Sequence, residues 1–325
     1  MTHKNFSHNV LDIDEAAEIE RIAGRIRSVV SETLRRRGLV VAISGGIDSS
    51  CCAALAVQAL GPERVLGLIM PERDSSDGSG LRANSLAQHL GIEVIKKDIA
   101  ATLEAIGCYQ WRDDAIKRAI PEYGSGWRMK IAISGGQAGR INHFRLIAQD
   151  PAGTVTDVRL GLREYLQIVA ATNFKQRIRK TLEYFHADRI NYAVVGTPNR
   201  LEYDQGFFVK NGDGAADVKP IAHLYKSQVY GLTRAMGLPE DVCGAEPTTD
   251  TYSLPQGQDE FYFALPYGKM DLALWAKNHG HSAAELAAVL DIDEKHAEFV
   301  LNDIDKKRAF AAYLHAPGVL VEDLD

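Results

Sequence analysis

The sequence predicts a doubly wound α/β fold, in which helices cover both faces of a mainly parallel sheet and a helical C-terminal part follows. Three observations predict this fold. Short continuous apolar runs rich in Val and Ile, typical of strands buried on both faces, alternate with longer segments of helical periodicity. A turn rich in Gly and Ser joins the first of these runs to a helix. From His223 onward the chain carries only helical patterns.

The individual elements follow from the same periodicities, and no low-complexity linker divides them, so we expect one domain over residues 1–325. Between about 108 and 163 the chain is rich in Gly, Arg and Asp with only scattered apolar residues, which predicts an irregular insertion. Strands are expected at 39–43, 65–70, 92–99 and 192–197, and helices at 14–37, 51–60, 81–90, 160–185, 223–236, 270–279, 283–290 and 294–313.

Composition places the chain among soluble globular proteins. It has 325 residues, 46% of them apolar and 25% charged, and a net charge of −6 that argues against nucleic acid as a partner. No apolar run is long enough to cross a membrane, and the first nine residues lack the apolar centre of a signal peptide. The four cysteines form no Cys-x-x-Cys pair, which argues against a zinc site. We therefore expect a cytoplasmic protein with buried thiols.

The turn after the first strand has the composition of an anion site. It consists of Ser44-Gly45-Gly46-Ile47-Asp48-Ser49-Ser50. The N–H groups at a helix start are unpaired and attract anions, and the two glycines let the backbone approach a phosphate closely. Asp48 would repel that ligand unless it binds a Mg²⁺ ion that accompanies the phosphates.

The turn is neither of the two common nucleotide-binding loops. The chain contains no Gly-x-x-x-x-Gly-Lys-Ser/Thr and no Gly-x-Gly-x-x-Gly after a strand. It resembles the pyrophosphate loop (PP-loop) of the ATP pyrophosphatase group, whose members share a fold like that of adenine nucleotide α-hydrolases. These enzymes cut ATP between its α and β phosphates and use the AMP part to activate a substrate.

The second half of the chain resembles one family of that group, the NAD⁺ synthetases. The matching motifs occur in the family's order: Asn173-Phe174-Lys175-Gln176-Arg177-Ile178-Arg179, Gly196-Thr197-Pro198-Asn199-Arg200-Leu201-Glu202, Gly206 to Asp217, Leu224-Tyr225-Lys226, Glu246-Pro247-Thr248 and Lys306-Lys307-Arg308. The resemblance covers residues 39 to about 99 and 173 to about 308.

This resemblance implies a ligase that converts deamido-NAD⁺, ATP and ammonia into NAD⁺, AMP and pyrophosphate. The nicotinate carboxylate would attack the α-phosphorus of ATP, and ammonia would then displace AMP from the acyl-adenylate, so no covalent protein nucleophile is needed. The resemblance also implies a homodimer. Only 43 residues precede Ser44, too few for a glutaminase domain, so free ammonia is the expected nitrogen donor unless a separate glutaminase docks.

The resemblance also implies roles for particular residues. Asp48 and Glu202 would bind Mg²⁺, the expected cofactor, because two carboxylates suit this ion. The positions implied to bind ATP or its pyrophosphate are Ser44, Gly45, Gly46, Asp48, Ser49, Ser50, Thr197, Lys226 and Thr248. Those implied to bind deamido-NAD⁺ are Arg177, Lys210, Asp217, Lys306 and Lys307; a solvated run is the other interpretation of the last two. Lys175 and Arg179 are weaker candidates that a helix could leave solvated.

Two questions stay open at this point. The segment after residue 99 is longer than in the short family members, and its Tyr109, Trp111, Arg112, Trp127 and Arg128 could bind a nucleotide or pack on the core. An adenylating amide ligase for a different carboxylic acid is the alternative function. Arg177, Lys210 and Asp217 favour deamido-NAD⁺, because together they suit a substrate with its own pyrophosphate.

Overall fold

A four-stranded parallel sheet forms the centre of the computed structural model, which describes residues 6–134, 143–245, 252–255, 257, 262–263 and 265–322. Its order is β3 (Glu93–Lys96), β2 (Val65–Ile69), β1 (Leu39–Ala42), β7 (Ala193–Val194). Every neighbouring pair is parallel. The predicted strands and their parallel arrangement are confirmed, although β3 and β7 are shorter than expected.

Both faces of the sheet are buried, as the continuous apolar runs predict. Leu39 and Val41 pack into one core cluster, while Val40 between them packs into another on the opposite face. Successive strand residues point to opposite faces, so a strand covered on both sides needs apolar residues at every position. The four cysteines are free and buried, in agreement with the expectation of buried thiols.

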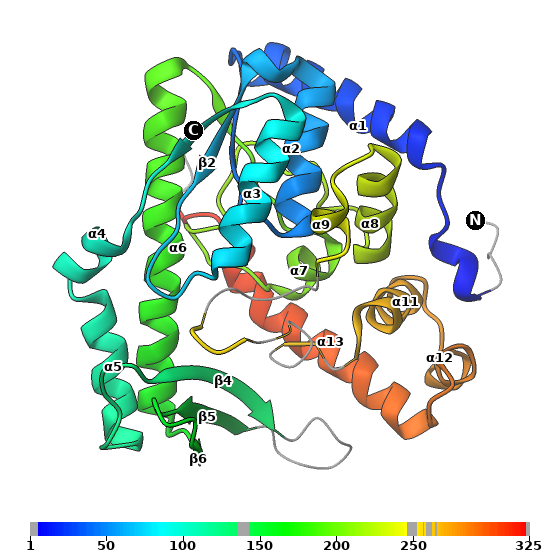
Figure 1. The fold of residues 1–325 in the computed structure, drawn as a ribbon. Helices are drawn as coiled ribbons and strands as arrows, with labels where there is room; N and C mark the ends of the chain where they lie inside the picture. The colour runs from blue at the N-terminus through cyan, green and yellow to red at the C-terminus, as the bar shows by residue number, and fades with distance from the viewer. Residues whose placement is uncertain are drawn as a thin grey trace.

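Helices cover the two faces of this sheet (Figure 1). The cluster on one face includes residues of α1 (Glu15–Ser28), α2 (Ile47–Leu60), α3 (Asp77–Leu90), α8 (Lys226–Ala235) and α9 (Glu240–Cys243). A π-helix, Val29–Thr33, continues α1. The other face packs against α4 (Ala100–Ala105), α5 (Cys108–Ala119) and the long α6 (Leu162–Ile190). The doubly wound fold is therefore confirmed.

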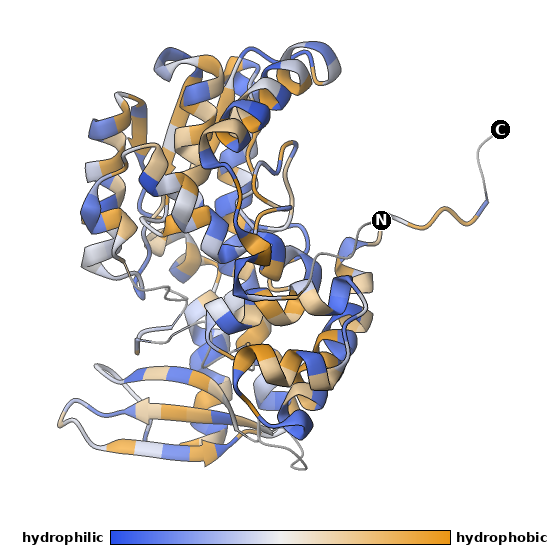
Figure 2. Cartoon of the chain, turned by 90° about the vertical axis from the view of Figure 1, so that its right-hand side faces the viewer, coloured by the Kyte–Doolittle hydropathy of each residue, from blue (hydrophilic) through white to orange (hydrophobic). Residues whose placement is uncertain are grey.

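The prediction that the insertion at about 108–163 is irregular is wrong, because the segment contains a helix and three strands. After α5, the chain forms an antiparallel sheet of β4 (Arg128–Ser134), β5 (His143–Gln149) and β6 (Val155–Arg159). Met129 and Ile131 are buried, as are Leu146 and Ala148 on the next strand, while the residues between them are not. Only one face is covered, so apolar residues occupy alternate positions and look scattered along the sequence. Figure 2 shows the three strands side by side at one end of the molecule.

The C-terminal part is helical, as predicted. It contains α7 (Arg200–Gln205), α11 (Tyr267–Asn278), α12 (Ala283–Leu290) and α13 (Glu294–His315). Short 3₁₀ helices lie at His8–Leu11 and Pro62–Arg64. Within the described ranges, no helix combines the length and the apolar character needed to cross a bilayer.

Candidate active site

The glycine- and serine-rich turn lies where β1 ends and α2 begins. The helix starts at Ile47, four residues before the position predicted, so Asp48 and Ser49 belong to its first turn. Gly45 has φ of +80°, and a Cβ there would lie 2.3 Å from the backbone oxygen of Ser79. A side chain would therefore prevent this close approach of backbone to backbone.

The serine hydroxyls hold the turn in shape. Ser49 Oγ accepts a hydrogen bond from the backbone N of Ser44 (3.3 Å) and donates to the carbonyl of Gly46 (3.0 Å). Ser50 Oγ donates to the same carbonyl (2.9 Å). Ser50 is fully buried and does not line the cavity described below, so its hydroxyl supports the turn from within.

A charge pair between a buried lysine and a half-buried aspartate closes the turn. Lys226, the first residue of α8, donates from Nζ to Oδ2 of Asp48. Oδ1 of the same carboxylate accepts from Asn199 Nδ2 at 3.0 Å. The two oxygens of Asp48 thus contact side chains from two separate segments, and both place the carboxylate over the start of α2.

Glu202 lies next to this pair and is held by a helix cap. Asn199 caps α7 by accepting from the backbone N of Glu202 (3.2 Å), while Glu202 Oε2 accepts from the backbone N of Asn199 (3.0 Å). This reciprocal capping box fixes the carboxylate without a ligand. Asn199 therefore orients Asp48 and Glu202 at once.

Burial and mutual repulsion shift the charges of this cluster. Desolvation, with the neighbouring Asp48 carboxylate as the next cause, raises the pKa of Glu202 to about 8. Burial on its own would lower the pKa of Lys226, but Asp48 and Glu202 raise it above the ordinary value. The lysine therefore stays charged beside Asp48, while a pKa of about 8 leaves Glu202 mostly protonated near neutral pH.

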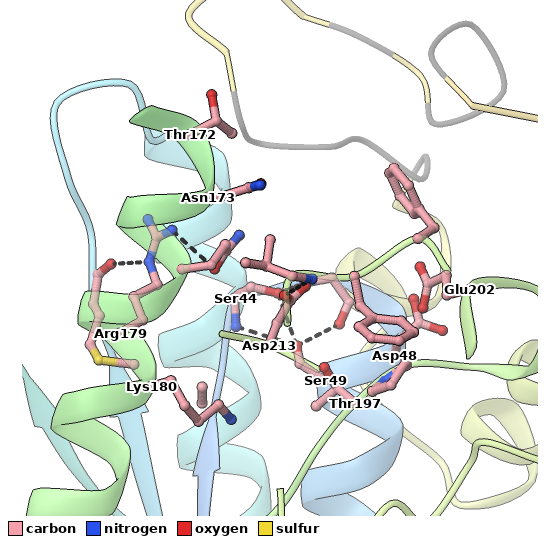
Figure 3. Close-up of a pocket in the computed structure, with 18 of the residues that line it drawn as sticks. Ser44, Asp48, Ser49, Thr172, Asn173, Arg179, Lys180, Thr197, Glu202 and Asp213 are labelled. Atoms are coloured by element: carbon pink, nitrogen blue, oxygen red, sulfur yellow. Dashed lines mark hydrogen bonds between the residues drawn. The ribbon is translucent and has the colours of Figure 1, made fainter. Parts of the chain in front are cut away.

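A cavity of about 1750 Å³ opens above the turn. One face of α6 forms its opposite wall, and Figure 3 shows Asn173, Arg179 and Lys180 of that helix across from Ser44, Asp48 and Ser49. The predicted residues that line it are Ser44, Gly46, Asp48, Ser49, Arg177, Thr197, Glu202, Lys210, Lys226, Lys306 and Lys307. The structure thus brings together residues from both halves of the chain.

The remaining predicted positions differ from these. Asp217 does not line the cavity; its Oδ2 accepts from the backbone N of Val194 (2.8 Å). Gly45 shapes the turn from behind. Thr248 lies outside the described residues.

The lysines of α13 are in different environments. Lys306 is exposed at the cavity, whereas Lys307 is paired with Asp303 at 2.5 Å and donates to the carbonyl of Tyr262. Burial lowers the pKa of Lys307. The solvated interpretation of this run is therefore wrong for Lys307.

Sequence reasoning assigned no role to Asp271 or Asn199 and misjudged the surroundings of Lys175. Lys175 is buried, contrary to the expectation that a helix could leave it solvated. Asp271 of α11 accepts from the backbone N of Lys226 (3.1 Å) and of Ser227 (2.7 Å), and so caps α8 from another helix. Asn199 alone had a local signal, an Asn three residues before a Glu at a helix start.

For three of the five insertion residues considered above, the structure decides between contact with a nucleotide and packing on the core. Tyr109 and Arg112 are buried, and Trp127 packs against the core cluster beneath the antiparallel sheet. None of these three lines the cavity. They pack on the core rather than face a nucleotide.

The donor set fits a cation bound by few protein ligands. Within the part of the chain that the structure describes, no three His, Cys, Asp or Glu side chains gather as a metal cluster. Asp48 and Glu202 provide two carboxylates at the cavity wall. Mg²⁺ typically takes one or two carboxylates and completes its shell with phosphate oxygens and water.

Comparison with known proteins agrees with this geometry. The family model for NAD synthase matches residues 18–139 and 149–310. The chain belongs to the NAD synthase family. The family and the enzyme class predicted from the sequence, a ligase, are confirmed, and ATP is its co-substrate.

Relatives in this family align over most of the chain. The NH₃-dependent NAD⁺ synthetase of Mesorhizobium japonicum is 54% identical over 96% of this chain and 98% of its own. That of Rhizobium meliloti is 52% identical over 98% and 96%. The Thermotoga maritima enzyme of the same name is 39% identical over 75% and 81%.

Solved structures share the fold. NMN synthetase from Francisella tularensis has a TM-score of 0.67 at 20% identity, covering 95% of this chain and 99% of its own. The NH₃-dependent NAD synthetase from Campylobacter jejuni has a TM-score of 0.62 at 22% identity, covering 95% and 100%. Identities this low establish the common fold alone.

Proposed function

We propose that the chain amidates deamido-NAD⁺ with ammonia, consuming ATP and releasing NAD⁺, AMP and pyrophosphate. The observation that carries the proposal is the placement of Asp48, Lys226 and Glu202 around the start of α2, at the cavity wall. An anion bound there meets unpaired N–H groups and one buried ammonium. Ligands of open α/β sheets bind at this carboxyl edge.

These residues support adenylation without a covalent intermediate. Lys226 would neutralise charge on the phosphates as the bond between the α and β phosphates breaks. The turn from Ser44 to Ser49 would hold the departing pyrophosphate. A bare carboxylate is a poor electrophile, so the AMP group supplies the leaving group that ammonia then displaces.

The carboxylates support Mg²⁺ as the cofactor. Burial and, after it, the neighbouring Asp48 carboxylate raise the pKa of Glu202, and a divalent cation bound between the two side chains would favour the ionised form of Glu202. Asp48 and Glu202 would hold this ion, which would supply positive charge to stabilise the pyrophosphate as it leaves. Glu202 would bind it while the cap from Asn199 keeps the carboxylate in place.

The other wall of the cavity supports a substrate with a pyrophosphate of its own. Arg177 donates from Nε to the carbonyl of Lys210 (3.1 Å), which brings two cationic residues together at the cavity. Lys306 adds a third. Asp217 does not line this cavity, so its predicted role and the expected homodimer stay predictions. A separate glutaminase and a cytoplasmic location stay predictions.

The experiment supplies Mg-ATP, ammonium and deamido-NAD⁺ to the purified protein and follows NAD⁺ and AMP. Both should form in equal amounts, and Asp48→Asn and Glu202→Gln should each suppress turnover. ADP in place of AMP would contradict the proposed bond cleavage. Amidation of a different carboxylic acid, with deamido-NAD⁺ left unchanged, would contradict the proposed acceptor.

A further inference from the structure

The loop after β2 forms the cavity wall on the side away from Lys226. Glu72, Arg73, Ser75 and Ser76 of this loop all line the cavity. The charged cluster around Asp48 lies toward β7, on the opposite side of β1. A nucleotide whose phosphates occupy the start of α2 would therefore place its nucleoside against the β2 side.

Tyr109 of α5 holds the first two charged residues of this loop. Its hydroxyl accepts from the backbone N of Arg73 (3.2 Å) and donates to Glu72 Oε2 (2.7 Å). The Arg73 guanidinium lies over the same ring, 3.8 Å from its centroid. One buried side chain thus fixes both the backbone and the side chain at this point of the wall.

Asp74 is held by two cations from two helices. Arg112 of α5 donates to Asp74 Oδ2 at 2.5 Å, and Lys175 of α6 donates to the same oxygen at 2.6 Å. Lys175 also donates to Glu72 Oε1 at 3.0 Å. Lys175 is 3% exposed, Arg112 4% and Glu72 6%.

Burying these charged side chains costs free energy, so the cluster is better explained by the geometry that it fixes than by stability. Removing four charged side chains from water offsets most of the attraction between them, so buried ion pairs add little stability compared with apolar packing. Arg112 also donates to its neighbour Asp113 (2.9 and 2.7 Å), while the other hydrogen bonds join residues 72–74 to α5 and α6. What the cluster provides is a fixed position for the loop relative to α5 and α6.

We propose that Tyr109 and Arg112 are positioning residues that hold the loop after β2 in the shape that binds ATP. Helix α5, which enters the predicted insertion, thereby contributes to the nucleotide site without touching the nucleotide. The proposal rests on the proposed function. Tyr109 and Arg112 should therefore affect the affinity for ATP and leave the affinity for the acceptor, deamido-NAD⁺, unchanged.

The test compares Tyr109→Phe and Arg112→Met with the unaltered chain. ATP binding is measured by calorimetry with no acceptor present, and kcat and the KM of each substrate by NAD⁺ formation. We expect the Kd and KM for ATP to rise about five- to tenfold, the effect of losing one hydrogen bond. The KM for deamido-NAD⁺ and kcat should stay within about twofold. Arg112→Lys, which keeps a positive charge beside Asp74, should recover part of the ATP affinity.

Arg118→Met is the matched control. Arg118 also ties α5 to α6, through Glu164 (2.9 Å) and Gln167 (2.6 Å), but does not contact the loop. ATP affinity should be unchanged in this variant.

An equal loss of ATP affinity in Arg118→Met, or an equal fall in kcat and affinity for all substrates in Arg112→Met, would overturn the proposal. Should Arg112→Met not fold, Tyr109→Phe removes only a hydroxyl, and unaltered ATP affinity there overturns it too. ATP binding by the unaltered chain without NAD⁺ formation would count against the proposed function alone.

Discussion

Lys226 donates a hydrogen bond from Nζ to Asp48 across 178 residues of sequence. Each of the two residues lies in the first turn of its helix, Asp48 in α2 and Lys226 in α8. Two helix N-termini, both favourable to anions, therefore meet at one charge pair. The proposed phosphate site therefore depends on contacts between distant parts of the chain.

Replacing Lys226 by Met should nearly abolish adenylation. The variant loses the buried cation proposed to contact the phosphates and leaves the Asp48 carboxylate without its charged partner. We expect kcat/KM for ATP to fall roughly 100-fold or more, the usual scale for loss of one preorganised charge contact. Release of pyrophosphate measures it. Lys277→Met, which removes an exposed pair with Asp305, should retain the original rate.

Stability should fall with rising pH because of Asp271. Burial raises its pKa to about 6 from the ordinary 3.8, although the N–H groups of Ser227 and Lys226 lower it in part. The folded chain therefore holds this proton more tightly than the unfolded chain. Its contribution to stability is complete below about pH 3.8 and is lost as the pH rises to about 6, on the order of 3 kcal/mol.

Asp271→Asn provides the comparison for this pH effect. The variant cannot titrate, so its unfolding free energy should lack that decrease. Urea unfolding between pH 4.5 and 7 measures both proteins. Curves that run parallel over this range would show that Asp271 does not titrate there.

Gly45→Ala should damage the turn, while Gly46→Ala should not. An alanine at position 45 would need φ of +80° and would place its Cβ 2.3 Å from the Ser79 carbonyl oxygen. We expect about 1–3 kcal/mol of lost stability from the strain, with weaker ATP binding. At Gly46 the nearest atom, Ser44 Oγ, is 3.4 Å away. Thermal unfolding with and without ATP would separate the two variants, and equal losses would argue against the backbone explanation.

Lys306→Ala should weaken substrate binding, whereas Lys307→Ala should lower stability. Lys306 is exposed at the cavity, so its loss should raise the KM for deamido-NAD⁺ several-fold, about 1 kcal/mol, with unfolding unaffected. Lys307 is paired with Asp303 inside the C-terminal part, so its loss should lower the thermal unfolding temperature. Identical effects of the two substitutions on KM and unfolding would refute this division.

The parallel sheet was predictable because its signal is local. Strands β1 and β2 are buried on both faces, and every one of their residues had to be apolar or small. The start of α2 was misplaced because Asp48, Ser49 and Ser50 have the residue types that favour helix caps over interiors. Here they lie inside the first turn, where ligand chemistry and turn support outweigh propensity.

The site was predictable in its members and not in its contacts. The family motifs place Asp48, Glu202 and Lys226 at one cavity, and the structure brings them there. Lys175 occurs in one of the same motifs, but the partners that bury it are about a hundred residues away. No pattern in the sequence near Lys175 predicts that Glu72 and Asp74 are its partners.

Lys306, Phe310 and Tyr313 of α13 line the same cavity as the turn after β1. The cavity wall is therefore complete only when this last long helix is in place. A ribosome adds about 5–20 residues per second. The residues of the turn are therefore synthesised roughly tens of seconds before the cavity is complete. A chain interrupted in that interval would lack α13, Lys226 or both, and with them part of the cavity wall.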